Sequence, residues 1–204
     1  MPLHDDLVAR AARLAAGADR ALLGIVGAPG AGKSTLAAAL VAALAGQAVL
    51  VPMDGFHLAD AELDRLGRRQ RKGAPDTFDA AGYVALLRRL TARTDEVVYA
   101  PLFRRDREQA EAGALPVPRN VPLVVTEGNY LLADGPFAPV RELLTECWYL
   151  DTGDGVRRDR LVARHVEHGR TRAEAEHWVR RIDEPNGRLV ARTRDRADLV
   201  LTRP

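Results

Sequence analysis

The chain has 204 residues, of which 47% are hydrophobic and 28% charged, and its formal net charge is +2. This length and composition are those of one globular domain, so we expect a single domain over residues 1–204. No apolar run approaches the roughly 18 residues of a membrane-spanning helix, and a lone cysteine, Cys147, excludes an internal disulfide and predicts a core position.

The slight positive charge comes from arginine, since Lys33 and Lys72 are the only lysines. The arginines are spread along the chain and interleaved with acidic residues, which favours anionic small molecules over nucleic acid as partners. The first residues include Asp5 and Asp6 and no apolar signal-peptide core. We therefore expect no membrane partner and a cytoplasmic location.

Along the chain, an amphipathic helix comes first, followed by a buried strand. Leu3, Leu7, Ala11 and Leu14 recur at helical spacing, and residues 21–26 are apolar throughout. Next comes a complete G-x-x-x-x-G-K-[ST] phosphate-binding loop and then a second helical pattern. The loop reads Gly27-Ala28-Pro29-Gly30-Ala31-Gly32-Lys33-Ser34-Thr35.

The order of strand, glycine loop and helix predicts a nucleoside triphosphate site. The glycines let backbone N–H groups turn around an anion, and the helix N-terminus adds partial positive charge. Lys33 can reach the β- and γ-phosphates, and the Ser34 hydroxyl can ligate magnesium.

Further strands and helices alternate over the rest of the chain. Strands are expected at residues 48–53, 97–100, 121–126, 147–150 and 199–201, and helices near 58–66, around 83–90, over 151–170 and from a capping box at 171–174. The basic stretch 68–75 is expected to be a loop, and residues 101–120, with several prolines, a long irregular one. Because several strands are apolar throughout, the pattern predicts an α/β fold with a mostly parallel sheet covered on both faces.

Two acidic residues follow predicted strands at the sheet edge where ligands bind in such folds. Asp54 follows the second strand and can accept a proton from an acceptor hydroxyl or hold a magnesium-bound water. Glu127 follows residues 121–126 at the Walker B position, where it would organise magnesium. The simpler alternatives are an Asp-Gly turn and an exposed strand-end carboxylate.

An arginine-rich helical stretch supplies candidate phosphate contacts. Arg157, Arg160 and Arg164 share a helix face and could close over the triphosphate as a lid, although a solvated, salt-bridged helix is the alternative. With Asp54 and Lys33, Arg160 and Arg164 are the catalytic candidates. The acceptor-site candidates are Phe56, His57, Arg71, Lys72, Tyr99, Phe103, Arg104 and Arg105, whereas Tyr83, Trp148 and Trp178 are expected in the core.

The motifs together resemble the uridine kinase, phosphoribulokinase and pantothenate kinase superfamily of P-loop kinases, and within it the bacterial branch similar to fructose transport system kinases. The resemblance rests on the phosphate loop, Met53-Asp54-Gly55-Phe56-His57-Leu58, residues 99–103, Thr126-Glu127-Gly128-Asn129-Tyr130-Leu131-Leu132 and residues 192–198. It implies a three-layer α/β/α P-loop NTPase fold with an arginine-bearing lid near 151–170. It also implies ATP and Mg²⁺ as cofactors.

The resemblance further implies transfer of the γ-phosphoryl group of ATP to a hydroxyl of a small metabolite. That acceptor would be a sugar, a nucleoside or a pantothenate-like alcohol, with Asn129 and Tyr130 near it. The region from Asn186 to Arg194 would lie toward the nucleotide base. Members of this superfamily often dimerise, so a homodimer is an option, although no patch in the sequence indicates one. The alternative functions are an ATP-hydrolysing regulator or assembly factor without a metabolite acceptor, and a nucleic-acid-binding NTPase.

Overall fold

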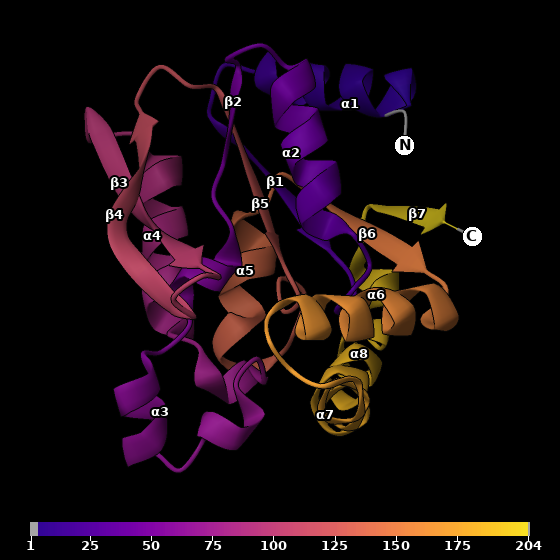
Figure 1. Ribbon diagram of the computed structural model, residues 1–204. Helices are drawn as coiled ribbons and strands as arrows, with labels where there is room; N and C mark the ends of the chain where they lie inside the picture. Colours follow the sequence, from indigo (N-terminus) through magenta and orange to yellow (C-terminus); the bar gives the residue numbers. More distant parts are fainter. Residues whose placement is uncertain (1–3, 204) are drawn as a thin grey trace.

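The computed structural model describes residues 4–203, and Leu3, which the apolar spacing assigns to the first helix, lies outside them. Within that range, one sheet has the strand order β2-β5-β1-β6-β7, and every neighbouring pair is parallel. Its strands are β1 (Ala21–Val26), β2 (Ala48–Leu50), β5 (Leu123–Gly128), β6 (Glu146–Thr152) and β7 (Leu199–Arg203). Helices lie on both faces (Figure 1). The expected α/β fold with a mostly parallel sheet is confirmed.

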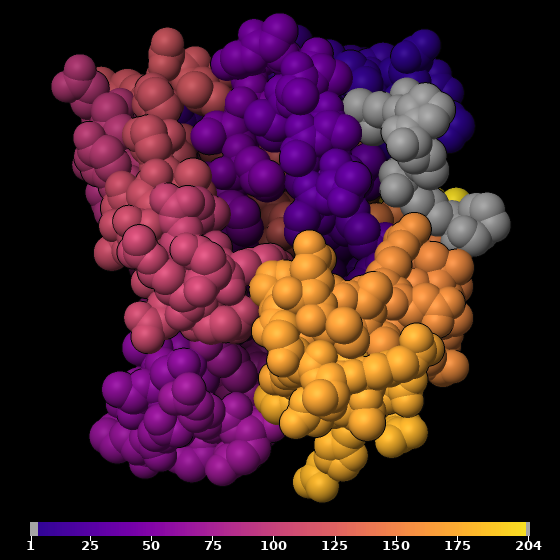
Figure 2. Space-filling model, viewed as in Figure 1, coloured from indigo at the N-terminus to yellow at the C-terminus, as the bar shows by residue number. Residues whose placement is uncertain are grey.

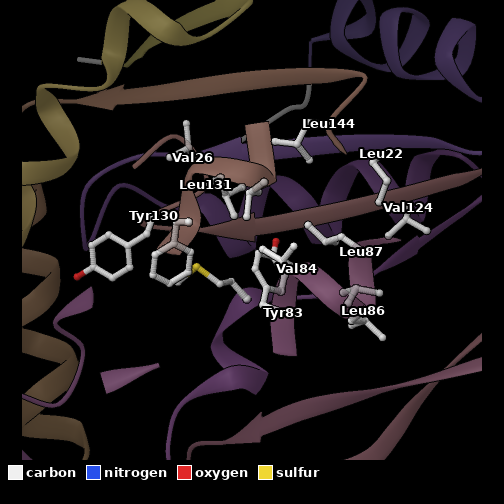
Figure 3. Close-up of a cluster of buried hydrophobic side chains, with 14 of the residues drawn as sticks. Leu22, Val26, Tyr83, Val84, Leu86, Leu87, Val124, Tyr130, Leu131 and Leu144 are labelled. Atoms are coloured by element: carbon white, nitrogen blue, oxygen red, sulfur yellow. The ribbon is translucent and has the colours of Figure 1, made fainter. Parts of the chain in front are cut away.

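The central strand β1 shows how the sequence buries both faces of this sheet. Because successive side chains of a strand point to opposite faces, Leu23 and Ile25 pack with α1 and α2, whereas Leu22 and Val26 pack with α4 and α5. Figure 3 shows the second of these clusters, with Leu22 of β1 among side chains of β5 and α4. The helices are α1 (Asp5–Ala15), α2 (Lys33–Ala43), α3 (Asp60–Arg65), α4 (Ala80–Ala92) and α5 (Ala138–Leu143). Among the described residues, no helix has both the length and the apolar character needed to cross a bilayer.

The expectation of a long irregular loop at residues 101–120 is wrong. Strands β3 (Val97–Arg104) and β4 (Gln109–Pro118) form an antiparallel hairpin that stands apart from the main sheet (Figure 1). A two-stranded ribbon has two free edges, so a proline can lie in it without removing a needed hydrogen bond. The register shifts between Ala100 and Leu102, on either side of Pro101. The prolines therefore mark edge and bulge positions of a hairpin here.

The C-terminal third forms a layer of helices beside the carboxyl edge of the sheet. Helix α6 (Asp154–Glu167) is followed by α7 (Arg172–Trp178), a π-helical turn (Val179–Asp183) and α8 (Glu184–Ala191). Asp151 belongs to β6, so the arginine-bearing helix is shorter than the expected 151–170. The capping box that the sequence predicts at the start of α7 is present, with Thr171 and Glu174 bonding each other's backbone N–H groups.

Cys147 lies fully buried in β6, as the sequence predicts. Burial raises the pKa of its thiol to about 12, so almost none of it is thiolate near neutral pH. Because the thiolate is the nucleophile, we expect a disulfide reagent such as DTNB to leave the folded protein unlabelled at about pH 8 and to label one thiol per chain after denaturation. Rapid labelling of the folded protein would contradict this burial.

Candidate active site

The phosphate-binding loop connects the end of β1 to the start of α2. Gly30 and Gly32 have φ angles of 79° and 94°, in the left-handed region that favours glycine. Gly30 also lies against α6, since a Cβ placed there would come within 2.7 Å of the carbonyl oxygen of Arg157. The loop shape therefore depends on glycine both for its backbone angles and for its close contact with α6.

Lys33, the first residue of α2, is buried at the base of this loop. Its Nζ donates to Asn129 Oδ1 at 2.7 Å and to the carbonyl oxygen of Ala28 at 3.2 Å. Burial lowers the pKa of Lys33, and the charges of Glu127 and Asp54 oppose that effect. The ammonium group therefore donates to two neutral oxygens and, within the part of the chain that the structure describes, to no carboxylate, and a buried ammonium group of this kind favours binding of a phosphate.

Glu127 is brought to Lys33 by the pairing of β5 with β1, which sets Glu127 beside Ile25. The Ser34 hydroxyl donates to Glu127 Oε1 at 2.8 Å. Burial, and then the charge of Asp54, raise the pKa of Glu127, while Lys33 counteracts them. A hydroxyl and a carboxylate at hydrogen-bond distance beside a phosphate loop are the oxygen donors that Mg²⁺ uses together with substrate phosphates. The residues present therefore fit a magnesium ion, although no cluster of three or more metal-binding side chains occurs within residues 4–203.

Asp54 lies on a short 3₁₀ helix, Met53–Phe56, that follows β2. Its side chain is 27% exposed, and its Oδ2 lies 3.5 Å from Arg105 Nη2. The next residue, Gly55, packs directly on the carbonyl group of Pro101, so the turn that holds Asp54 is set against the hairpin. The Asp-Gly pair therefore permits a close backbone contact that orients the carboxylate.

A cavity of about 830 Å³ brings these groups together beyond the carboxyl ends of β1, β2 and β5. The rose hairpin and the orange helices α6 and α7 border it from two sides (Figure 2). Many of the residues that the sequence predicts for the site line this cavity: Pro29, Gly30, Lys33, Ser34, Asp54, His57, Lys72, Phe103, Arg105, Glu127, Asn129 and Arg164.

One wall of the cavity is aromatic. The ring of His57 lies 4.0 Å from that of Phe78 and 4.7 Å from that of Phe103, measured between centroids. His57 Nδ1 also bonds the carbonyl oxygen of Asp54 at 2.8 Å. Burial lowers the pKa of His57, so the imidazole is neutral near pH 7 and its ring is part of an apolar wall.

Several predicted site residues do not line the cavity. Tyr99 is 61% exposed on the hairpin, and Arg104 pairs with Glu111 at 2.6 Å on the same hairpin. Alternation along β3 explains why Phe103 reaches the cavity and its neighbour Arg104 does not. Phe56 packs on Tyr83 at 5.2 Å between ring centroids.

The structure also places four further candidates in supporting positions. Tyr130 is buried, and its hydroxyl donates to the carbonyl oxygen of Gly73. Arg194 pairs with Asp151 at 3.0 Å beside β6. Arg157 is buried and donates to the carbonyl oxygen of Pro29 at 2.8 Å, so it braces the phosphate loop from outside the cavity. Arg160 lies near the loop, with Nη1 at 3.5 Å from the carbonyl oxygen of Ala31.

Comparisons with known proteins agree with this geometry. A family model described as an AAA domain matches residues 22–185. The chain is also 34% identical to a protein of Schizosaccharomyces pombe named "Putative uridine kinase C227.14", over 97% of this chain and 89% of that protein. The chain belongs to the P-loop kinases. Membership in this family implies ATP as the nucleotide that the loop binds.

One solved structure and one further relative of this P-loop kinase also have the names of small-molecule kinases. The crystal structure of a "putative fructose transport system kinase" from Silicibacter sp. TM1040 has 35% sequence identity and a TM-score of 0.88, and the match covers 98% of this chain and 100% of that one. A pantothenate kinase of Rhodococcus opacus is 30% identical over 64% of this chain, but the match spans only 43% of that enzyme.

Some cavity residues of this kinase were missed by sequence reasoning. Trp178, expected in the core, lines the cavity, and the guanidinium of Arg170 stacks 3.8 Å from its ring centroid. Asp183, the last residue of the π-helical turn, also lines it. No local pattern distinguishes a cavity-lining tryptophan from a core one on an amphipathic helix. The π-helical turn, which often marks functional sites, has no sequence signal of its own.

Proposed function

We propose that this protein is an ATP- and Mg²⁺-dependent phosphotransferase that acts on a hydroxyl group of a small metabolite. The observation that carries the proposal is the position of Asp54, which shares one cavity with Lys33, Ser34 and Glu127. A switch or motor ATPase has no need for a carboxylate facing the phosphate loop across an open cavity with an aromatic wall. The aromatic wall and the volume of the cavity leave room for an acceptor beside the triphosphate.

In the proposed reaction, the acceptor oxygen attacks the γ-phosphorus while the bond to the β-phosphate oxygen breaks. ADP leaves with that electron pair, and the acceptor proton passes to the Asp54 carboxylate. Lys33 and the loop N–H groups hold the phosphates, and Arg164 and Arg160 approach them from α6. Ser34 and Glu127 would hold Mg²⁺, which neutralises charge on the phosphate oxygens.

An acceptor screen tests this function. ADP release would be measured with ATP and Mg²⁺ against sugars, nucleosides and hydroxy acids, each compared with ATP alone. We expect at least one alcohol to raise ADP release well above the acceptor-free rate and to gain a phosphate detectable by mass spectrometry. Steady hydrolysis that no alcohol accelerates would favour the regulator instead. A homodimer and a cytoplasmic location stay predictions from the sequence.

A further inference from the structure

Arg105 lies at the tip of the β3–β4 hairpin and lines the cavity. Its side chain is 46% exposed, and its contact with Asp54, at 3.5 Å, is at the outer limit of a hydrogen bond. The same tip is held to the acceptor side of the cavity by Lys72, whose Nζ donates to the carbonyl oxygen of Glu108 at 2.5 Å. Arg105 is therefore positioned at the site but only weakly engaged there.

A second guanidinium faces the same space from the opposite wall. Arg164 of α6 lines the cavity, and within residues 4–203 its guanidinium has no hydrogen bond or ion pair. Burial, and then the charge of Arg105, lower the pKa of Arg164. Two guanidinium groups that repel each other across one cavity indicate a place for an anion.

Two of the other acidic side chains of the cavity are already paired with basic residues. Asp60 pairs with Lys72 at 2.7 Å and with Arg69 at 3.0 Å. Asp183 pairs with His165 at 2.9 Å. Asp54 is the carboxylate that Arg105 contacts, and when Asp54 accepts a proton as the base, Arg105 loses the charge that it faces.

The two guanidinium groups act on different ends of the cavity. Arg164 belongs to α6, whose backbone contacts Gly30 of the phosphate loop, whereas Arg105 follows closely after Phe103, whose ring packs on His57 in the aromatic wall. The γ-phosphate of ATP can therefore engage Arg164 and leave Arg105 without an anion. The partner of Arg105 has to come from the acceptor.

We propose that the acceptor is an alcohol that also carries a carboxylate or phosphate group, and that Arg105 binds this group. This inference rests on the proposed kinase function. When the anion binds, Arg105 exchanges its long contact with Asp54 for a shorter charge-assisted contact with that anion, and Asp54 Oδ2 becomes free to accept the hydroxyl proton. Arg105 is then the residue that selects anionic over neutral alcohols.

The test uses acceptors in matched pairs that differ only in the charged group, such as glycerate with glycerol, pantothenate with panthenol, and ribose 5-phosphate with ribose. We expect the wild-type enzyme to prefer the anionic member of the pair it uses. In Arg105→Gln, kcat/KM for that member should fall about 10- to 100-fold, the usual effect of losing a hydrogen bond to a charged group, while the neutral member changes little.

Arg107→Gln is the matched control, because it removes the same charge from the same hairpin tip. The Arg107 side chain is 75% exposed, and among the described residues its one ion pair is with Asp106, at 3.8 Å. We expect Arg107→Gln to keep the wild-type preference within about 2-fold.

Three results would overturn the inference, each in a distinct way. If neutral alcohols are used and anionic ones refused, the enzyme is a kinase but the acceptor class is wrong. If Arg105→Gln lowers kcat/KM equally for the anionic and the neutral member of a pair, Arg105 acts on the transferred phosphoryl group instead. If no alcohol of either kind accelerates ADP release, the kinase proposal itself fails and this inference fails with it.

Discussion

Replacing Asp54 by Asn should slow phosphoryl transfer by about 10²-fold or more and leave ATP binding nearly unchanged. The amide keeps the size of the carboxylate but cannot accept the acceptor proton. ATP affinity should persist because Lys33 and the loop N–H groups, which hold the phosphates, do not contact the Asp54 side chain. Acceptor-dependent ADP release measures the rate, and calorimetric titration with ATP measures the affinity.

Asp76→Asn is a suitable control for this experiment. Asp76 is an acidic residue of the neighbouring 60–78 segment, pairs with Arg71 and Arg68, and does not line the cavity. We expect it to keep turnover within about 3-fold of wild type. Full activity of Asp54→Asn would remove the base assignment, and a loss of ATP affinity as large as the loss of rate would assign Asp54 to nucleotide binding.

The sequence predicts the phosphate side of this site well because its signals are local. The loop from Gly27 to Thr35 carries its glycines, lysine and serine within nine consecutive residues, and the flanking strand and helix have clear periodicities. Asp54 and Glu127 were found by the same logic, since each follows an apolar strand. In a parallel sheet the ends of such strands meet at one edge.

The acceptor side could not be read in the same way because it depends on side-chain direction and on contacts distant in sequence. Phe103 and Arg104 are neighbours in the chain, yet only Phe103 faces the cavity. The strand that decides this belongs to a hairpin whose prolines predict a loop there. Arg157 and Arg164 share a helix, but Arg157 braces the loop from outside while Arg164 faces the cavity. Helical spacing predicts that such side chains project from the same side of the helix. It does not predict which group each side chain contacts.

Arg157 has the largest expected effect on stability. Its side chain is 6% exposed and donates to Pro29, to Asp154 at 2.7 Å and to Glu184 at 3.3 Å. In Arg157→Met, the carbonyl oxygen of Pro29 loses its hydrogen-bond donor. Glu184 Oε1 also loses its guanidinium partner. We expect the free energy of unfolding to fall by about 3 kcal/mol, the lower end of the cost of breaking a buried ion pair. Urea denaturation without nucleotide measures this change.

Arg158→Met separates this bracing role from a simple loss of charge. Arg158 binds the same Glu184, at 3.1 Å, but its side chain is 53% exposed, so its removal should cost less than about 1 kcal/mol. ATP affinity should also fall in Arg157→Met and not in Arg158→Met, because Gly30 of the phosphate loop rests on the backbone of Arg157 and follows any shift of α6. If Arg157→Met loses ATP affinity while its unfolding free energy stays at the wild-type value, Arg157 contacts the nucleotide directly, as the sequence predicts, and the bracing role is wrong.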